Sequence, residues 1–290
     1  MKSRVLVGIV GVPFLILVLG WAPDWATLIL VAGMCAIGAW ELMHAVAGEA
    51  GKPLLSLTVA AAALVPVCVY FEMAEALETA EGLTELPLLG LLAAIFIFLT
   101  FAMAIRRYDR QEAIPFADVT AALFAGLVFP IMLSCLLRLR MVPYIGMLLV
   151  FFPLCISFGS DTFAYFSGLL FGKHKLSPRV SPKKTVEGAI GGLVGGVVGM
   201  MIMPFVGGAV LSDAFMSPAE AALFGLVGSA VSQIGDLSFS VIKREFGVKD
   251  YGKLLPGHGG ILDRFDSVTF AAPAVWLTLR LMWGGVLFPV

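Results

Sequence analysis

Nine long apolar runs divide this sequence, each close to the length of about 20 residues that a helix needs to cross a bilayer. The 290 residues are 60% hydrophobic and 13% charged, which is more apolar surface than one soluble core can hide. We therefore expect an all-α, polytopic integral membrane protein with about nine transmembrane helices. The predicted spans are 5–21, 25–43, 54–71, 86–105, 119–137, 144–171, 186–207, 219–242 and 267–288.

The distribution of basic residues predicts the orientation of these spans. Cytoplasmic loops of membrane proteins are enriched in Lys and Arg, and a chain with its N-terminus inside places 16 of its 19 basic residues on that side. The glutamate-rich loop between Glu72 and Glu85 then falls outside. We expect an N-in, C-out protein whose functional loops lie in the cytoplasm.

A single integral-membrane domain is expected over residues 1–290, because no linker, repeat or low-complexity segment divides the chain. Residues 1–140 would form N-terminal helices, and residues 141–290 the helices and cytoplasmic loops of the functional site. The lack of a long N-terminal extension favours a multi-pass protein of a bacterial inner membrane, surrounded by membrane lipid. No separate basic domain suggests a nucleic-acid partner. The four cysteines lie inside predicted spans without metal-ligand spacing, as packing residues do.

Among the carboxylates inside predicted spans, Asp161, Glu187 and Asp236 stand out as candidates. An ionisable group in hydrocarbon is costly and usually serves a function. Asp236 belongs to a polar stripe at three- and four-residue spacing, which indicates a helix face turned to a partner helix or a wet cavity. The stripe consists of Ser229, Gln233, Asp236, Ser240 and Lys243. A buried ion pair with a structural role is the alternative for these acids.

Asp161 shares one predicted helix face with Ser157, Tyr165 and Gly168. The surrounding stretch SFGSD favours a break of this helix at Gly159. Asp161 would then stand beside a gap in the span rather than inside a continuous helix.

The loop GKHKLSPRVSPKKTVEG, residues 172–188, suits a phosphate. Ser181 is predicted to cap a helix whose first residue is Pro182. Free backbone N–H groups would then face the cytoplasm beside Lys184 and Thr185, as in other anion sites. The plain alternative is that a basic loop only orients the helices. The glycines that follow at four-residue spacing, among them Gly188, Gly192 and Gly196, predict close helix packing.

A second loop, KREFGVKDYGKLLPGHGGILDRFD at residues 243–266, mixes acids with bases. Orientation by basic residues does not explain Asp250, Asp263 and Asp266. Carboxylates hold magnesium against a triphosphate, and we expect Asp236 and Asp263 to converge on one such ion. A zinc site is not expected, because the three histidines are scattered and the loop has no cysteine.

At these positions the sequence resembles the phosphatidate cytidylyltransferase family, also called CDP-diacylglycerol synthases. The resemblance has no departure across 27 positions and extends upstream through SQIGD, Asp161 and SPKKTVEG, over roughly the C-terminal half. The matching pattern is Ser240-x-Ile242-Lys243-Arg244, Lys249-Asp250-x-Gly252 and Leu255-Pro256-x-His258-Gly259-Gly260-Ile261-x-Asp263-Arg264-Phe265-Asp266.

The resemblance implies a magnesium-dependent nucleotidyltransferase that transfers CMP from CTP to phosphatidic acid, giving CDP-diacylglycerol and pyrophosphate. It implies an active site in a polar cavity open to the cytoplasm and the bilayer. A second, monovalent cation near the Mg2+ is also implied. The implied catalytic residues are Asp236, Asp263 and Asp266, of which Asp236 and Asp263 bind the metal. The implied substrate-binding residues are Asp161, Ser181, Lys184, Thr185, Glu187, Lys243, Arg244, Lys249, Asp250, His258 and Arg264.

Two other functions fit the same sequence features. A related CTP-dependent lipid kinase would transfer the γ-phosphoryl group and release CDP. A cation-coupled transporter also carries intramembrane carboxylates and broken helices, although here the charges gather on one side and no half-repeat is visible. The sequence leaves the oligomeric state open, with a homodimer as one expectation.

Overall fold

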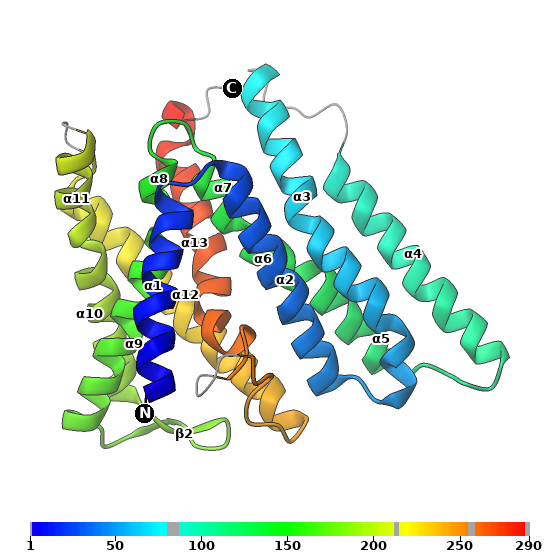
Figure 1. Cartoon of the computed structure of the whole chain (residues 1–290). Helices are drawn as coiled ribbons and strands as arrows, with labels where there is room; N and C mark the ends of the chain where they lie inside the picture. The colour runs from blue at the N-terminus through cyan, green and yellow to red at the C-terminus, as the bar shows by residue number, and fades with distance from the viewer. Residues whose placement is uncertain (1, 80–86, 212–214, 255–258, 288–290) are drawn as a thin grey trace.

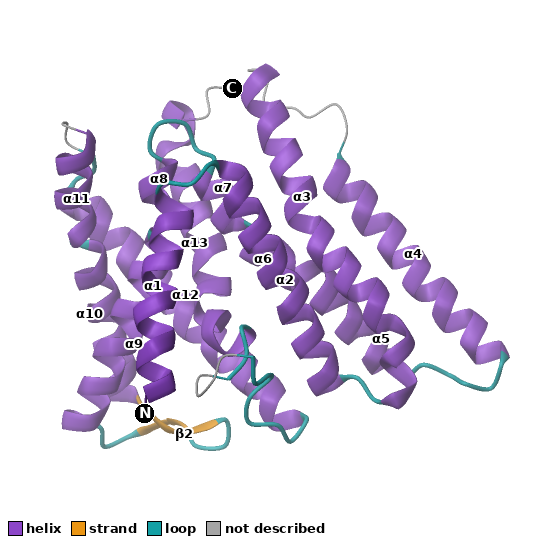
Figure 2. Ribbon diagram, viewed as in Figure 1, coloured by secondary structure: helices purple, strands orange, loops and turns teal. Residues whose placement is uncertain are grey.

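The structure is a computed structural model that describes residues 2–79, 87–211, 215–254 and 259–287 (Figure 1). These residues form an almost entirely helical protein with one short β-hairpin (Figure 2). The elements of the first half are α1 (Lys2–Gly20), α2 (Asp24–Val46), the 3-10 helix η1 (Glu49–Leu54), α3 (Leu55–Thr79), α4 (Leu88–Asp109), α5 (Phe116–Leu123), the π-helical turn η2 (Phe124–Val128), α6 (Phe129–Leu133) and α7 (Cys135–Arg140). The second half has α8 (Gly146–Leu149), α9 (Phe152–Phe171), β1 (Lys175–Ser177), β2 (Ser181–Thr185), α10 (Val186–Met200), α11 (Ile202–Leu211), α12 (Pro218–Glu245) and α13 (Leu262–Leu287).

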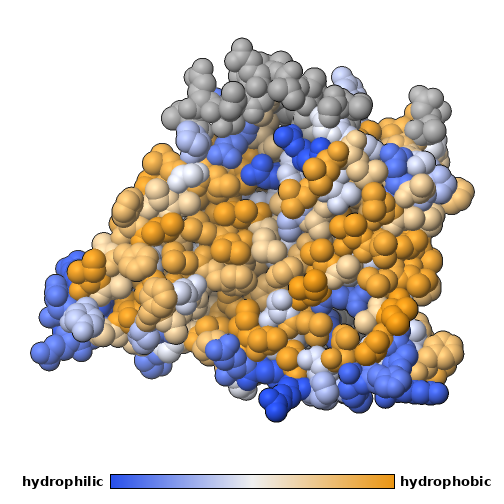
Figure 3. All heavy atoms as spheres, turned by 180° about the vertical axis from the view of Figure 1, so that it is seen from behind, coloured by the Kyte–Doolittle hydropathy of each residue, from blue (hydrophilic) through white to orange (hydrophobic). Residues whose placement is uncertain are grey.

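Seven helical segments among the described residues are long and apolar enough to cross a membrane, which confirms the all-α, polytopic class. Helices α1 and α13 occupy the other two predicted runs, and the apolar part of α1 found in this way is the shorter Ile9–Gly20. The total of nine crossings therefore stays a prediction. On the face shown in Figure 3, apolar residues cover most of the middle, and polar residues gather along the lower edge and near the top.

The span predicted at 119–137 is one helical path that changes character halfway. It runs through α5, the π-helical turn η2, α6 and α7. Pro130 stands just after the π-helical turn and has no backbone N–H to donate to the preceding turn. Its ring also crowds the carbonyl four residues earlier, so the helix widens there rather than ending.

Helices α9 and α10 approach each other through glycine, as predicted from the small residues of α10. A Cβ atom on Gly159 would come within 2.5 Å of the carbonyl oxygen of Gly195, and one on Gly195 would meet the Gly159 carbonyl in return. The expected break at Gly159 is wrong, because α9 is continuous over Phe152–Phe171. Gly159 instead lets the backbone of α10 lie directly against α9.

Four connections lie at one end of the molecule, which we call the hairpin end because the connection between α9 and α10 carries the hairpin (Figure 1). The connections are those between α2 and α3, α4 and α5, α9 and α10, and α12 and α13. Helix α1 begins at this end, whereas α13 runs away from it toward the opposite end (Figure 1). The two predicted halves share one core, in which Leu42 and Phe129 pack in a cluster with Phe239, Leu262 and Val268.

Candidate functional site

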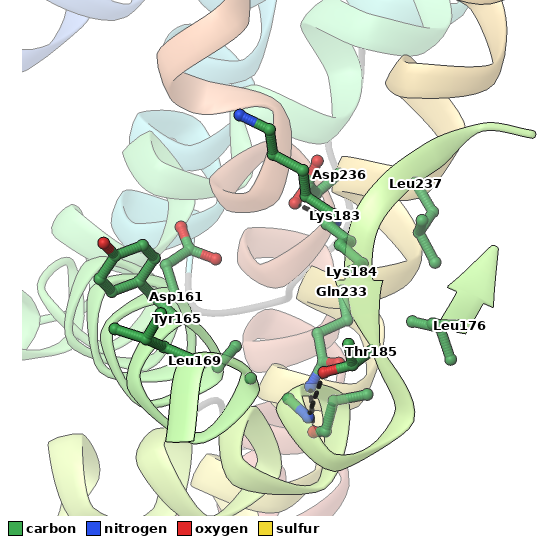
Figure 4. A pocket seen from close by; sticks show the side chains of 14 residues that line it. Asp161, Tyr165, Leu169, Leu176, Lys183, Lys184, Thr185, Gln233, Asp236 and Leu237 are labelled. Atoms are coloured by element: carbon green, nitrogen blue, oxygen red, sulfur yellow. Dashed lines mark hydrogen bonds and ion pairs between the residues drawn. The ribbon is translucent and has the colours of Figure 1, made fainter. Parts of the chain in front are cut away.

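A cavity of about 460 Å³ opens at the hairpin end between α9, α10, α12 and the hairpin. Asp161 projects from one wall, and Lys184, Gln233 and Asp236 lie across from it (Figure 4). The remaining lining is mainly apolar or small, with Ala164, Tyr165, Gly168, Leu169, Leu176, Gly188, Ala189 and Leu237 beside Lys183 and Thr185. The cavity therefore combines charged and apolar side chains on both of its walls.

Lys184 of β2 and Asp236 of α12 form a salt bridge inside this cavity. Their side chains keep 30% and 27% of their surface exposed, so water or a ligand reaches both. Ser240 donates a hydrogen bond of 3.4 Å to Asp236, and Gln233 donates one of 3.1 Å to the Ala189 carbonyl of α10. The predicted polar stripe of α12 thus faces both a partner helix and a cavity.

The predicted helix cap at Ser181 is wrong. Ser181 and Pro182 lie in β2, which pairs antiparallel with β1 in the register Lys175↔Thr185 and Ser177↔Ser181. Helix α10 begins only at Val186, and Thr185 is its N-cap, accepting a hydrogen bond of 3.1 Å from the Gly188 N–H. The hairpin pairs the backbone of 181–185, so this stretch is extended rather than helical.

Glu187 lies in the first turn of α10 but does not line the cavity. Its carboxylate accepts the backbone N–H groups of Lys173 and His174 at 3.1 to 3.3 Å and contacts the His174 ring at 2.6 Å. Val186 N–H bonds to the His174 carbonyl. In the structure Glu187 fastens the connection after α9 to the start of α10.

A second ion pair joins Lys243 of α12 to Asp263 in the first turn of α13 at 3.0 Å. Its side chains are only 11% and 3% exposed, so this pair is buried, whereas the pair of Lys184 and Asp236 is partly exposed. The other oxygen of Asp263 accepts the N–H groups of Tyr251 at 2.8 Å and Gly260 at 3.0 Å. The predicted place of Asp263 in the loop 243–266 is wrong, because helix α13 already begins at Leu262.

Electrostatics connects the two ion pairs. The negative charge of Asp236 lies close enough to repel both Asp161 and Asp266, and Asp161 repels Asp266 as well. Lys184 and Arg264 act on Asp161 with the opposite sign, and Lys243 does so on Asp266. Side chains of α9, α12, α13 and β2 therefore form one charged group, to which we refer as the acid–base cluster: Asp161, Lys184, Asp236, Lys243, Asp263, Arg264 and Asp266.

The acid–base cluster has the donor chemistry for a hard cation such as magnesium, which prefers carboxylate oxygens. Neither Asp161 nor Asp266 forms a salt bridge with another described residue, although Asp266 is only 8% exposed. The carboxylates of the cluster repel one another, and a bound cation would relieve that repulsion. Within the described ranges no three acid, His or Cys side chains lie close enough to be ligands of one ion, and Asp236 and Asp263 are paired with Lys184 and Lys243.

The remaining predicted site residues lie around the cluster. Arg244 donates to the carbonyls of Val180 in the hairpin turn, at 3.1 Å, and Val248 at 3.3 Å, so it holds the two loops together. Lys249 and Asp250 are exposed in the connection after α12. His258 lies outside the described residues.

Sequence reasoning missed two residues that shape this site. Tyr251 donates its hydroxyl to the Phe239 carbonyl at 2.9 Å and holds its ring 5.3 Å from the Lys243 ammonium, in cation–π contact. Burial raises the pKa of Tyr251 far above its usual range, so the phenol stays protonated. Glu41 of α2 accepts backbone N–H groups at the start of α13. Glu41 lies inside a predicted span. The reason for selecting Asp161, that an ionisable group in hydrocarbon is costly and usually serves a function, therefore applied to Glu41 too.

Comparison with known proteins finds a family match over nearly the whole chain. The profile of the cytidylyltransferase family matches residues 2–282. Relatives named phosphatidate cytidylyltransferase include one from Haemophilus influenzae, 36% identical over 143 residues. Others are from Brucella abortus, 42% identical over 134 residues, and Thermotoga maritima, 34% identical over 126 residues.

These pairwise alignments cover part of each protein. They span 47%, 46% and 43% of this chain for the Haemophilus, Brucella and Thermotoga proteins, in that order. They span 49%, 47% and 47% of the relatives. The chain thus matches about half the length of these relatives.

Proposed function

Because the chain belongs to the cytidylyltransferase family, we propose that it transfers CMP from CTP to phosphatidic acid, giving CDP-diacylglycerol and pyrophosphate. Relatives that carry the name phosphatidate cytidylyltransferase support this choice of acceptor. The observation that carries the proposal furthest is the mixed lining of the cavity. Its charged side chains suit a phosphate, and its apolar side chains suit the acyl chains of a lipid.

In this proposal the lipid enters the cavity along exposed apolar residues of α9. Tyr165 and Leu169 on α9 line the cavity and are 66% and 68% exposed. The lipid's chains would leave between them and the hairpin residue Leu176 and extend into the surrounding bilayer, where apolar surface is the favourable neighbour. The phosphate would lie between Asp161 and Lys184 (Figure 4).

The chain's cations provide the phosphate contacts. Lys184 is partly exposed in its salt bridge with Asp236, so its ammonium can exchange a carboxylate oxygen for a phosphate oxygen. Lys243 is held in place by Asp263 and the Tyr251 ring, which fixes its charge at the end of α12. Arg264 adds a third positive charge close enough to act on Asp161.

In the proposed reaction a phosphate oxygen of phosphatidic acid attacks the α-phosphorus of CTP. The bond from that phosphorus to the bridging oxygen of the β-phosphate breaks, and pyrophosphate leaves. The attacking phosphate is already anionic at neutral pH, so no strong base is needed. Positioning and charge neutralisation supply most of the acceleration, as in other phosphoryl transfers.

Magnesium, and a monovalent cation beside it, are part of this proposal. Asp236 and Asp263 would hold the magnesium with Asp266 next to them, and the bound ion would neutralise charge on the nucleotide phosphates. In the structure, Lys184 and Lys243 hold the two carboxylates in place. Release of these lysines toward substrate phosphates would free carboxylate oxygens for the ion.

The proposal also places the hairpin end in the cytoplasm, where CTP is made. Most basic residues of the chain lie in the segments at this end or beside them, as the enrichment of cytoplasmic loops requires. Membrane lipid and CTP would then reach the cavity from different sides. The bacterial inner membrane and a homodimer remain parts of the proposal without a structural argument of their own.

The test is turnover by the purified protein in mixed micelles of detergent and phosphatidic acid. Each of the four nucleoside triphosphates is supplied in turn, with magnesium or with a chelator. We expect CDP-diacylglycerol and pyrophosphate with CTP, no product with ATP or GTP, and no product with chelator. Release of CDP with a phosphorylated lipid would favour a kinase instead. Ion-coupled solute uptake by proteoliposomes without nucleotide, and no lipid product, would favour a transporter.

A further inference from the structure

Glu41 is a carboxylate from the N-terminal half of the chain that reaches the start of α13. Its side chain is fully buried. Its two oxygens accept the backbone N–H groups of Ile261 at 3.1 Å and Leu262 at 2.9 Å. These partners lie 220 and 221 residues further along the chain.

The N-terminus of α13 needs such a partner. The first N–H groups of a helix have no acceptor within the helix, and they carry the positive end of its dipole. A side chain just before the helix usually supplies the acceptor, but Gly259, Gly260 and Ile261 precede Leu262 here. Glu41 supplies both the acceptor oxygens and a negative charge from another helix.

The two loop segments beside Glu41 are shaped around its carboxylate. A Cβ atom added at Gly252 or at Gly260 would collide with the Glu41 carboxylate. The backbone on both sides of the connection between α12 and α13 therefore packs directly on this side chain. Glycine at these positions is explained by the close approach of Glu41.

Asp263 holds the same short segment from the other side. The Gly260 N–H bonds to Asp263, and the next two N–H groups, of Ile261 and Leu262, bond to Glu41. The charge of Asp263 also acts on Glu41, so the two carboxylates lie near each other with the backbone amides between them. Movement of this backbone would displace Asp263 and so break its ion pair with Lys243.

We infer that Glu41 is a positioning residue for the proposed transfer reaction, which this inference presupposes. It contacts no substrate in our account. It fixes the first turn of α13, so that Asp263 and Asp266 hold their orientation toward Lys243 and Asp236. The N-terminal helices thereby contribute a residue to a site that is otherwise built from the C-terminal half.

The test compares Glu41→Gln with a matched variant, Glu72→Gln. Glu72 of α3 accepts the N–H of Leu89, in the first turn of α4, at 2.7 Å. Both variants thus lose a carboxylate that caps a neighbouring helix, but only Glu41 caps the helix that carries Asp263. Glutamine keeps nearly the same volume and one acceptor oxygen, so one amide at the start of α13 loses its partner.

Two measurements are made on each purified variant well below its unfolding temperature. The first is hydrogen exchange at the amides of 259–266, which we expect to accelerate in Glu41→Gln and not in Glu72→Gln. The second is kinetics with CTP and phosphatidic acid. We expect kcat to fall by about tenfold or more in Glu41→Gln with the KM for phosphatidic acid nearly unchanged. Glu72→Gln should retain wild-type kinetics.

If Glu41→Gln does not yield folded protein, Glu41→Asp replaces it, because the shorter acid keeps the charge but cannot reach both amides. Unchanged exchange at 259–266, or faster exchange with normal kcat, would overturn the inference while leaving the proposed function intact. Equal losses of kcat in the Glu41 and Glu72 variants would reduce Glu41 to a structural cap. An inactive wild-type protein would overturn the proposed function itself, and this inference with it.

Discussion

The two lysine–aspartate pairs of the site look alike in sequence and differ in burial. Lys184 and Asp236 are about 30% exposed in an open cavity, whereas Lys243 and Asp263 are almost fully enclosed. A partly exposed ion pair contributes little to stability, in most cases less than about 1 kcal/mol. Breaking a buried pair costs about 3–5 kcal/mol, because one charge is left without a partner. The same substitution should therefore have different consequences in the two pairs.

Lys184→Gln should abolish most of the turnover and leave the fold intact. It removes a positive charge from the cavity wall without removing the hairpin, and loss of one such contact to a charged transition state costs about 100-fold or more in kcat. Lys175→Gln is the matched control, because Lys175 is exposed on the paired strand opposite Thr185. Steady-state kinetics on monodisperse protein gives the result. Equal activities of the two variants would remove Lys184 from the site.

Asp236→Asn and Asp263→Asn should both lose turnover, but only the second should lose stability. The Asp236 variant should unfold within a few degrees of wild type, since its salt bridge is open to solvent. The Asp263 variant leaves Lys243 buried without its counter-ion, and its free energy of unfolding should fall by about 3 kcal/mol. Thermal unfolding and specific activity per folded molecule, across a magnesium titration, separate the two effects. A fully active Asp263→Asn protein would contradict the assignment of that carboxylate.

Single residues of the site were predictable where the reason for them is local. An acid inside an apolar run is visible in the sequence, and Asp161 and Asp236 both line the cavity with Lys184. Ser181 misled because Ser-Pro starts many helices, and the pairing with β1 that keeps it extended is a contact between strands. Glu41 was equally visible as an acid inside an apolar run, but its partners lie more than 200 residues away, so no sequence spacing linked it to the site.

At the scale of elements, the site depends on how closely α9, α10 and α12 approach. Gly159 and Gly195 place the backbones of α9 and α10 in contact. Asp161 lies on the first of these helices, and Thr185 caps the second. The width of the cavity is therefore set by glycine contacts deeper in the bundle, since lipid gives no hydrophobic force that would press helices together.

Gly195→Ala should push α9 and α10 apart. The added methyl group would meet the Gly159 carbonyl and the Phe163 side chain, so we expect a loss of about 1–3 kcal/mol of stability. Gly33→Ala is the control, because a Cβ at this helical position of α2 meets nothing within 4 Å. Thermal unfolding of both variants in one detergent tests the contrast. Equal unfolding midpoints of the two variants would mean that α9 and α10 can accept a methyl group between them, against this account.

The long apolar runs predicted the positions of the membrane helices well, because the bilayer sets the length and hydrophobicity of such helices. The hairpin was not predicted, since SPKKT has neither β-branched residues in alternation nor an apolar face. It forms next to α10, where Glu187 and Thr185 fasten both of its ends. The π-helical turn before Pro130 was also missed, because a proline within an apolar run predicts a kink without its form.

At the scale of the whole molecule, the two ends differ in the charged residues that they carry. The hairpin end carries the acid–base cluster and the start of α1, and the connection between α7 and α8 lies at the opposite end (Figure 1). Tyr144 in that connection is 95% exposed. These two ends should therefore face different compartments.

Single cysteines test this arrangement in a background that lacks the four native ones. Tyr144→Cys should react with a membrane-impermeant maleimide on intact cells. Lys175→Cys in the hairpin should react only after the membrane is permeabilised, because basic loops stay in the cytoplasm. Labelling of Lys175→Cys on intact cells would invert the orientation and remove the proposed access of the cavity to CTP.

The central claim is that this molecule moves the α-phosphorus of CTP onto a lipid phosphate. Purified protein is incubated with phosphatidic acid micelles, magnesium and CTP labelled with ³²P at either the α or the γ position, and the lipid phase is extracted. We predict that α label enters the lipid as CDP-diacylglycerol and that γ label stays in the aqueous phase as pyrophosphate. Label from the γ position in the lipid, with CDP released, would contradict the account.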